Sequence, residues 1–197
     1  MFVSYHNQTI RYSMEQQHVN KLISRSKQDD LEAFRKLVEG HQSFVYSLSF
    51  RLLCNEDDAR DAVQETFIRV WKNLERFNTD MRFSTWLYKI ASNICYDRMK
   101  ALKRRNNLVS FDIENTSLLN HASLENIEIT VINAELAELI KFFTNDLAPK
   151  QKLVFTLHDL EGLEVDEIVV ITGLSPGKIK SNLYCARQCL RGKLENI

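Results

Sequence analysis

The sequence predicts an all-α protein made of two small helical domains, and three observations support this. Its 197 residues include only two prolines and five glycines, which are the residues that punctuate strand-rich folds. Apolar residues recur at helical spacings in both halves of the chain. A polar stretch without that period, residues 106–132, separates the halves. With 44% hydrophobic and 26% charged residues the composition is globular, which excludes disorder over the whole chain.

Three helices are expected in the first half. Asp29 and Asp30 precede the first of them, where carboxylates suit the positive end of the helix dipole. Asn55, followed by three acids, marks the start of the second helix, which should pack against the first as an antiparallel hairpin. After a polar loop, Ser84 or Thr85 can cap the third. The apolar stripes place these helices at residues 31–52, at residues 56–74 and from the cap to about Arg105.

Helical patterning resumes at residue 133. Thr172, Gly173 and Leu174 form a turn, after which Ser175 supplies an N-cap and Pro176 a first helical residue. A helix, a turn with glycine and a basic amphipathic helix together are typical of a helix-turn-helix, and an ordinary hairpin with a solvated basic face fits the same pattern. The expected helices cover 136–143, 149–157, 164–171 and 176–194, and the last turns Lys178, Ser181, Tyr184, Cys185 and Gln188 outward.

Charge is strongly segregated although the formal net charge is zero. Residues 82–105 carry seven basic side chains and one acid, and residues 175–194 carry five basic side chains and no acid. Residues 106–132 carry four acids and no Lys or Arg, so they form an acidic linker. Such blocks indicate basic elements directed at one partner and acidic elements directed elsewhere.

Several classes of protein are disfavoured. The four cysteines show no C-x-x-C spacing and no Cys/His cluster, so we expect reduced thiols in the cytoplasm and no metal site. The N-terminus lacks the layout of a signal peptide, and no apolar run is long enough to cross a bilayer. We expect neither an enzyme nor a cofactor, because the chain has no Gly-rich phosphate loop, no H-E-x-x-H and no G-x-S-x-G.

The junction at residues 82–88, R-F-S-T-W-L-Y, mixes cations with aromatic rings. Rings beside phosphate-neutralising cations are suited to unpaired bases. The alternative is that Phe83, Trp86 and Leu87 belong to the core and the cations form a solvated flank.

Four segments in order and spacing resemble the extracytoplasmic-function group of bacterial sigma factors, from about Ser24 to Leu194. They are D-A-R-D-A-V-Q-E-T-F-I-R-V-W-K-N-L-E-R-F at 58–77, R-F-S-T-W-L-Y-K-I-A-S-N at 82–93, L-A-P-K-Q at 147–151 and I-K-S-N-L-Y-C-A-R at 179–187. The resemblance implies an N-terminal extension at 1–23, a domain at 24–105 for the polymerase clamp and the −10 promoter element, a linker at 106–132 near the RNA exit path, and a domain at 133–197 for the −35 element and the β flap. A further hypothesis is that the acidic linker occupies a nucleic-acid channel of the polymerase, where its negative charge mimics RNA and the RNA later displaces it.

The resemblance also implies roles for individual residues. The clamp motif D-x-x-Q-E falls on Asp61, Gln64 and Glu65. Contacts to the −10 element, including a base captured out of the stack, fall on Asn78, Arg82, Phe83, Trp86, Lys89 and Asn93. Contacts to the −35 element fall on Lys178, Lys180, Ser181, Asn182, Tyr184, Cys185 and Arg187.

This sequence departs from the family pattern at three positions. Arginine is common where Asn182 and Cys185 stand, and alanine is common where Val169 stands. Cysteine cannot make the bidentate contact to guanine that arginine makes, worth about 1–3 kcal/mol of discrimination, so the −35 preference should differ.

The leading hypothesis is a sigma factor that works with core RNA polymerase and promoter DNA, controlled by an anti-sigma factor, without membrane insertion. The first alternative is a helix-turn-helix regulator that binds its site alone as a dimer. The second is a helical interaction protein without a DNA role, which leaves the basic blocks unexplained.

Overall fold

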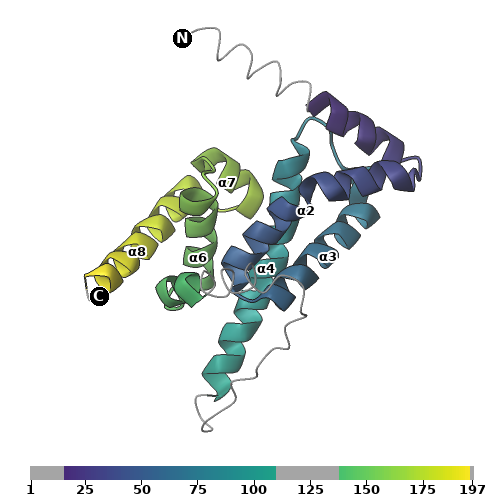
Figure 1. Ribbon diagram of the computed structural model, residues 1–197. Coiled ribbons are helices and arrows are strands. Elements are labelled where there is room, and N and C mark those ends of the chain that lie inside the picture. Colours follow the sequence, from purple (N-terminus) through teal and green to yellow (C-terminus); the bar gives the residue numbers. More distant parts are fainter. Residues whose placement is uncertain (1–15, 110–137, 196–197) are drawn as a thin grey trace.

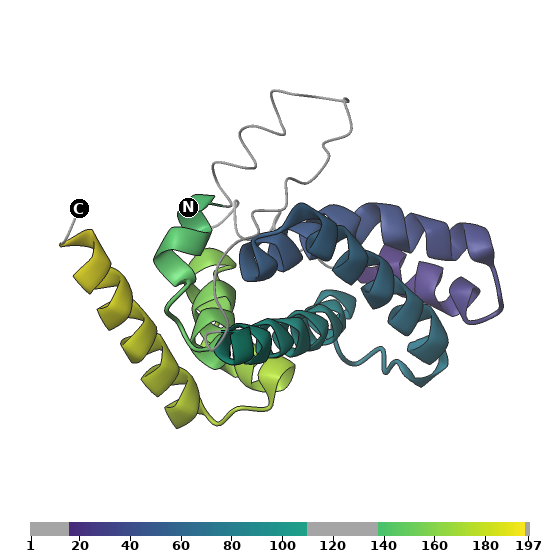
Figure 2. The same ribbon diagram turned by 90° about the horizontal axis from the view of Figure 1, so that it is seen from below.

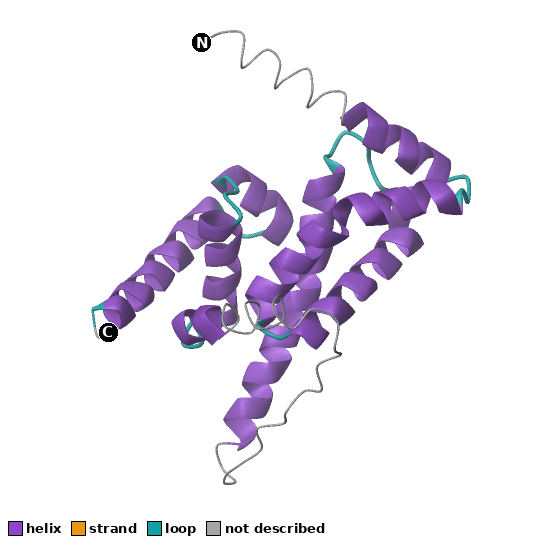
Figure 3. Cartoon of the chain, viewed as in Figure 1, coloured by secondary structure: helices purple, strands orange, loops and turns teal. Residues whose placement is uncertain are grey.

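The computed structural model describes residues 16–109 and 138–195, and these ranges consist of helices and connecting turns (Figures 1 and 3). The first range contains a helix over residues 16–26, α2 (Leu31–Leu53), α3 (Glu56–Asn73), the 3-10 turn η1 (Leu74–Arg76) and α4 (Phe83–Val109). The second contains a helix over residues 138–144, α6 (Pro149–Phe155), the π-helical turn η2 (Thr156–Leu160), α7 (Val165–Thr172) and α8 (Pro176–Leu194). The expected all-helical class is confirmed.

Local side-chain chemistry sets the starts of α2 and α3. The Asp30 carboxylate accepts a hydrogen bond from the Ala33 backbone N–H at 3.0 Å. The Asn55 side chain accepts one from the Asp58 N–H at 2.9 Å. Each cap satisfies a backbone donor that the first helical turn leaves without a partner.

The expected cap at Ser84 or Thr85 is wrong, whereas Ser175 and Pro176 stand at the expected N-cap and first helical positions of α8. Helix α4 begins at Phe83, before Ser84 and Thr85, with the Trp86 N–H bonded to the Arg82 carbonyl at 3.2 Å. Ser175 has the extended backbone of an N-cap, but its hydroxyl makes no capping bond. Pro176 supplies that helix start instead, because its ring fixes φ at a helical value.

Two boundaries also differ from expectation. Leu22 and Ile23 are buried in the core. The end of the expected 1–23 extension is therefore part of the first helical unit. Helix α4 continues to Val109, four residues into the expected linker. Residues 1–15 and the rest of the linker, 110–132, lie outside the described residues.

The first unit is a bundle in which α2, α3 and α4 pack against one another. Its buried side chains include Leu37, Leu48, Val70, Leu87 and Ile94. In the second unit α6 and α7 both pack on α8, and Ile168, Ile171, Ile179 and Leu183 are buried. Burial of these apolar side chains stabilises each unit.

The two units also pack on each other. Helices α6 and α7 lie between α4 and α8 (Figures 1 and 2), and the buried apolar side chains of both units form one cluster. The chain has the two helical units that the sequence predicts, and in this structure the units are in contact. Helix α8 nevertheless keeps Lys178 and Lys180 exposed on its outer face.

A buried carboxylate reinforces this contact. Glu161, which follows the π-helical turn, has a side chain only 9% exposed. The Tyr88 hydroxyl donates to it at 3.0 Å, and Arg51 donates both to it and to the Leu160 carbonyl, the latter at 3.2 Å. Burial and the neighbouring Glu161 charge raise the pKa of Tyr88, which keeps the phenol protonated as a donor.

Candidate functional site

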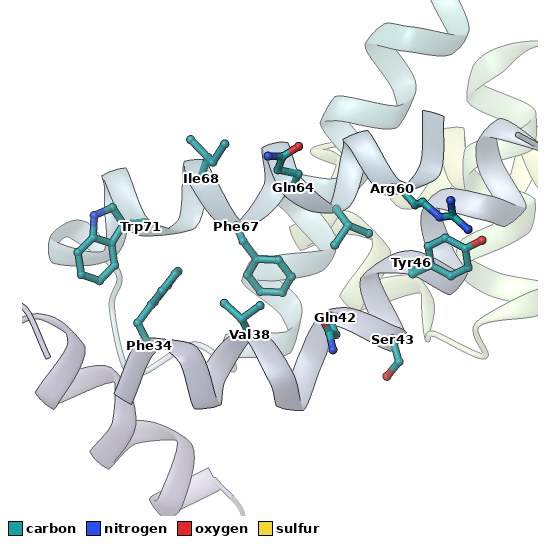
Figure 4. A pocket seen from close by; sticks show the side chains of 11 residues that line it. Phe34, Val38, Gln42, Ser43, Tyr46, Arg60, Gln64, Phe67, Ile68 and Trp71 are labelled. Atoms are coloured by element: carbon teal, nitrogen blue, oxygen red, sulfur yellow. The ribbon is translucent and has the colours of Figure 1, made fainter. Parts of the chain in front are cut away.

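An open apolar groove of about 740 Å³ runs between α2 and α3 (Figure 4). Its apolar lining is Phe34, Val38, Val63, Phe67, Ile68 and Trp71, and its polar lining is Gln42, Ser43, Tyr46, Arg60 and Gln64. Phe34 and Trp71 meet edge to face, with ring centroids 4.7 Å apart. Ile68 is 46% exposed. A groove of this kind accepts the apolar face of an amphipathic helix.

The three residues of the expected clamp motif are not equivalent. Asp61 and Gln64 are exposed on α3, and Gln64 lines the groove. Glu65 is bonded within the chain, because its carboxylate accepts from Arg69 and, at 3.1 Å, from Arg98 on α4. Glu65 therefore joins α3 to α4, and its carboxylate is not a free surface acceptor.

A second pocket, of about 270 Å³, lies where the end of α3 faces α4. It is lined by Arg69, Asn73, Arg76, Trp86, Ile90 and Asn93. Trp86 and Asn93 were expected near DNA, whereas the other three polar residues were not. Arg69 and Asn73 stand on α3 and Arg76 on the following turn η1. The sequence shows only polar positions there, and the packing of α3 on α4 brings them beside Trp86. An indole ring, two amides and two guanidinium groups, of which that of Arg69 also pairs with Glu65, suit an unpaired base with its phosphate.

Phe83 is not available to DNA, so that assignment is corrected. The side chain is 1% exposed, and its ring lies edge to face with those of His41 and Phe77, with centroids 5.1 and 5.7 Å away. Burial lowers the pKa of His41, whose Nδ1 lies 2.8 Å from the Leu37 carbonyl. Phe83 is a core residue that supports Trp86, 6.0 Å away.

The remaining −10 candidates lie at the surface. Lys89 and Asn93 are exposed on α4. Asn78 forms a turn in which its side chain accepts from the Asp80 N–H at 3.0 Å. Arg82 is 54% exposed and stands 3.9 Å from Glu167 of the second unit.

Helix α8 presents a polar outer face and is held by Ile179, Leu183 and Ala186, which are buried. The expected −35 contacts Lys178, Lys180, Ser181, Tyr184 and Cys185 are exposed. Asn182 is half-buried and donates to the Lys178 carbonyl at 2.7 Å, which fixes its amide along the helix.

Arg187 is already engaged. Its guanidinium makes a two-point contact with the Asp159 carboxylate, with Nε at 2.9 Å, and this contact raises the pKa of Arg187. Asp159 belongs to the π-helical turn, so the ion pair joins α8 to its neighbour. Arg187 therefore positions α8 more directly than it offers a charge to a phosphate.

The described residues contain neither a metal cluster nor a membrane span. Across residues 16–109 and 138–195 no three His, Cys, Asp or Glu side chains gather as metal ligands would. In the same ranges every helix is too short or too polar to cross a membrane. Burial raises the pKa of the Cys95 thiol to about 11, which keeps that thiol protonated.

Comparison with known families gives two matches, one in each unit. Residues 37–105 match the Sigma-70 region 2 family, and this range contains the α3–α4 pocket and every groove-lining residue except Phe34. Residues 142–190 match the Sigma-70 region 4 family, which covers the helix-turn-helix.

Two solved structures share the fold. One is CnrH in complex with the cytosolic domain of CnrY, with a TM-score of 0.63 and 21% identity over 91% of this chain and 98% of that chain. The other is the sigma factor RpoE in complex with the anti-sigma factor NepR from Bartonella quintana, with a TM-score of 0.60 and 22% identity over 82% of this chain and 96% of that chain.

Curated relatives match along nearly their whole length. The ECF RNA polymerase sigma factor SigW of Bacillus subtilis is 30% identical over 91% of this chain and 98% of its own. The ECF RNA polymerase sigma-E factor of Haemophilus influenzae is 30% identical over 89% of this chain and 95% of its own. The chain therefore belongs to the extracytoplasmic-function group of bacterial RNA polymerase sigma factors.

Proposed function

We propose that the chain binds core RNA polymerase through the α2–α3 groove, captures an unpaired −10 base in the α3–α4 pocket and contacts the −35 duplex with α8. The observation that carries the proposal is the α3–α4 pocket, where Trp86 stands with two amides and two guanidinium groups. Stacking and phosphate neutralisation are both needed to hold a base that has left the duplex.

The groove supports the polymerase contact. It is apolar along its floor, and Asp61 and Gln64 stand exposed on the helix that forms one wall. An amphipathic helix of the polymerase clamp can bury its apolar face there while its basic residues meet Asp61. Glu65 supports this surface by holding α3 against α4. The outer face of the second unit is exposed and is therefore accessible to DNA and the β flap.

The test is reconstituted transcription from a fork-junction promoter, with core polymerase alone and with this chain added. We expect initiation only with both components, and tight promoter binding only in the presence of core. Promoter binding by the isolated chain as a dimer, without core-dependent initiation, would overturn the proposal.

Replacing Trp86 with alanine is expected to weaken binding to a fork-junction promoter with an unpaired −10 base by about 5- to 150-fold, the factor that corresponds to the 1–3 kcal/mol of a base–aromatic stack. Affinity for core should not change, because Trp86 does not line the α2–α3 groove. The matched DNA is the same promoter with that base replaced by an abasic site. The variant and the parent should bind the abasic DNA equally, and an equal loss on both DNAs would show that Trp86 acts only through folding.

Replacing Lys180 with alanine is expected to weaken holoenzyme binding to all promoters alike. Its ammonium is exposed on the outer face of α8, so it is suited to a phosphate. The slope of log K against log salt should fall by about one. Loss confined to one −35 base pair would contradict a phosphate contact.

The two units must separate when both promoter elements are bound. Elements centred near −35 and −10 lie roughly 85 Å apart at about 3.4 Å per base pair. In the structure the buried apolar side chains of the two units form one cluster, so the units lie in direct contact. We infer that the packed arrangement belongs to the free chain and opens on the polymerase.

Removing the Glu161 carboxylate is expected to favour the open form. The substitution Glu161→Ala deletes the acceptor of Tyr88 and Arg51 across the contact. Hydrogen bonds to a charged group contribute about 1.5–3 kcal/mol, and Arg51 is 35% exposed, so we expect about tenfold more open form. Small-angle X-ray scattering should show a larger radius of gyration for this variant and no change for Asp166→Ala, whose side chain is exposed. Identical scattering from both variants would show that apolar packing alone sets the arrangement.

Control by an anti-sigma factor is part of the proposal. It is supported by the similar fold of the Bartonella quintana sigma factor, which was solved with its anti-sigma factor. We propose that the chain acts in the cytoplasm with the polymerase and performs no catalysis itself, since the polymerase supplies the chemistry.

A further inference from the structure

The turn after the first helix contacts the segment that joins α3 to α4. Lys27 follows the helix over residues 16–26, and its ammonium donates to the Phe77 carbonyl at 3.0 Å and to the Glu75 carbonyl at 3.3 Å. Glu75 belongs to η1 and Phe77 is its C-cap residue. The last carbonyls of a helix lack partners within the helix, and a lysine ammonium is a suitable donor to them.

The turn that carries Lys27 is itself well fixed. Arg25 and Asp30 pair across it, with Nε of the first at 2.8 Å from the carboxylate of the second, and Asp30 also caps α2. Ser26 is buried, and its hydroxyl donates to a carbonyl one helical turn earlier. Asp29 has a left-handed backbone, with a φ of 59°. The Lys27 ammonium therefore reaches η1 from a turn with little freedom of its own.

The two carbonyls that Lys27 binds stand on either side of Arg76, which lines the α3–α4 pocket. Phe77 is 4% exposed, and its ring lies against that of Trp86 with centroids 4.8 Å apart. Lys27 thus fixes the backbone around one pocket residue and the ring that supports another. Tight recognition requires that such groups be held within about 0.5 Å of their binding geometry.

We propose that Lys27 is a positioning residue for the α3–α4 pocket, which holds Arg76 and Trp86 in the geometry that receives the unpaired −10 base. This role rests on the function proposed above for that pocket. Lys27 does not line the pocket and acts only through the backbone that it binds. The turn after the first helix thereby takes part in −10 recognition, although none of the expected −10 contacts lies on it.

The first test measures the segment in the absence of DNA. Lys27→Met keeps an apolar stem and removes the donors. The matched control is Lys21→Met, which removes the same charge at an exposed position of the first helix. In hydrogen exchange followed by mass spectrometry, the amides of residues 74–82 should exchange at least about threefold faster in Lys27→Met, and those of α8 should not change. Equal exchange over 74–82 in the parent and both variants would overturn the proposal.

The second test measures base capture by the complete holoenzyme, on the fork-junction promoter and on its abasic counterpart. The quantity compared is the ratio of the two affinities, because a lost charge weakens both DNAs alike whereas a misplaced pocket weakens only the DNA with the base. We expect this ratio to fall about 3- to 10-fold in Lys27→Met, which keeps the Trp86 ring, and to stay at the parent value in Lys21→Met. A ratio in Lys27→Met equal to that of the parent would contradict a positioning role.

A fluorescent base makes the capture itself visible. When 2-aminopurine replaces the unpaired −10 base, stacking on an aromatic ring quenches its emission, so saturating holoenzyme should quench it less with Lys27→Met than with the parent. If the parent binds both DNAs equally and leaves the emission unquenched, the pocket does not capture the base, and the proposed function fails together with this role. If the parent discriminates and quenches, and Lys27→Met does so equally, only the role of Lys27 fails.

Discussion

The variant Ile68→Glu should lose binding to core polymerase by more than about 100-fold while it folds as the parent does. Ile68 lines the α2–α3 groove and is 46% exposed in the free chain, so a carboxylate there stays hydrated until a partner covers it. Once covered it becomes a buried charge without a counterion, which costs about 3–5 kcal/mol. The measurement is the dissociation constant of the labelled chain from core polymerase, with circular dichroism to verify the fold.

The matched control for this prediction is Val170→Glu. Val170 is also a β-branched residue on a helix and is 48% exposed, but it stands on α7 in the second unit. Exposed substitutions of this kind change stability by about 0.5 kcal/mol or less, so both variants should melt near the parent. If Ile68→Glu binds core as well as Val170→Glu does, the groove is not the clamp site.

Features that depend on residues close together in the chain could be predicted from the sequence. Asp30 and Asn55 cap α2 and α3 as their residue types predict, because a capping bond joins positions three residues apart. The inward stripe of α8, with Ile179 and Leu183 buried, follows directly from helical periodicity. The order of helices and the helix-turn-helix followed from the same signals.

Contacts between distant residues could not be predicted in this way. Arg51 and Glu161 stand 110 positions apart, and Arg187 and Asp159 stand 28 apart. In sequence, Arg187 is one more exposed cation on a basic helix. Only the packing of α8 beside the π-helical turn shows that a carboxylate already occupies it.

The α3–α4 pocket shows the same limit. Trp86 and Asn93 were found through their motif, which lies on one helix. Arg69, Asn73 and Arg76 lie on the polar face of the preceding segment and have no local feature that distinguishes them from solvated residues. The angle at which α3 crosses α4 brings these groups together, and that angle depends on the whole core of the unit.

The second large prediction concerns Phe83. From the sequence alone, the rings of Phe83 and Trp86 can each belong to the core or contact DNA. Phe83→Ala is expected to lower the free energy of unfolding by about 3–5 kcal/mol, since the ring is 1% exposed and lies against His41 and Phe77. For a chain of this size that corresponds to roughly 6–20 °C in melting temperature. Differential scanning calorimetry of the parent and the variant measures the shift.

Two companion variants separate a core role from a DNA role. Phe83→Leu keeps most of the apolar volume, so it should recover most of the lost stability and, at a temperature where it is folded, bind the fork-junction promoter as the parent does. Lys89→Ala, at an exposed position of the same helix, should leave the melting temperature unchanged and weaken only DNA binding. If Phe83→Ala instead melts like the parent but releases the promoter, its ring would have to leave the core to meet a base. In that case Phe83 could not also hold Trp86 in place, because one ring cannot lie in the core and against a base at the same time.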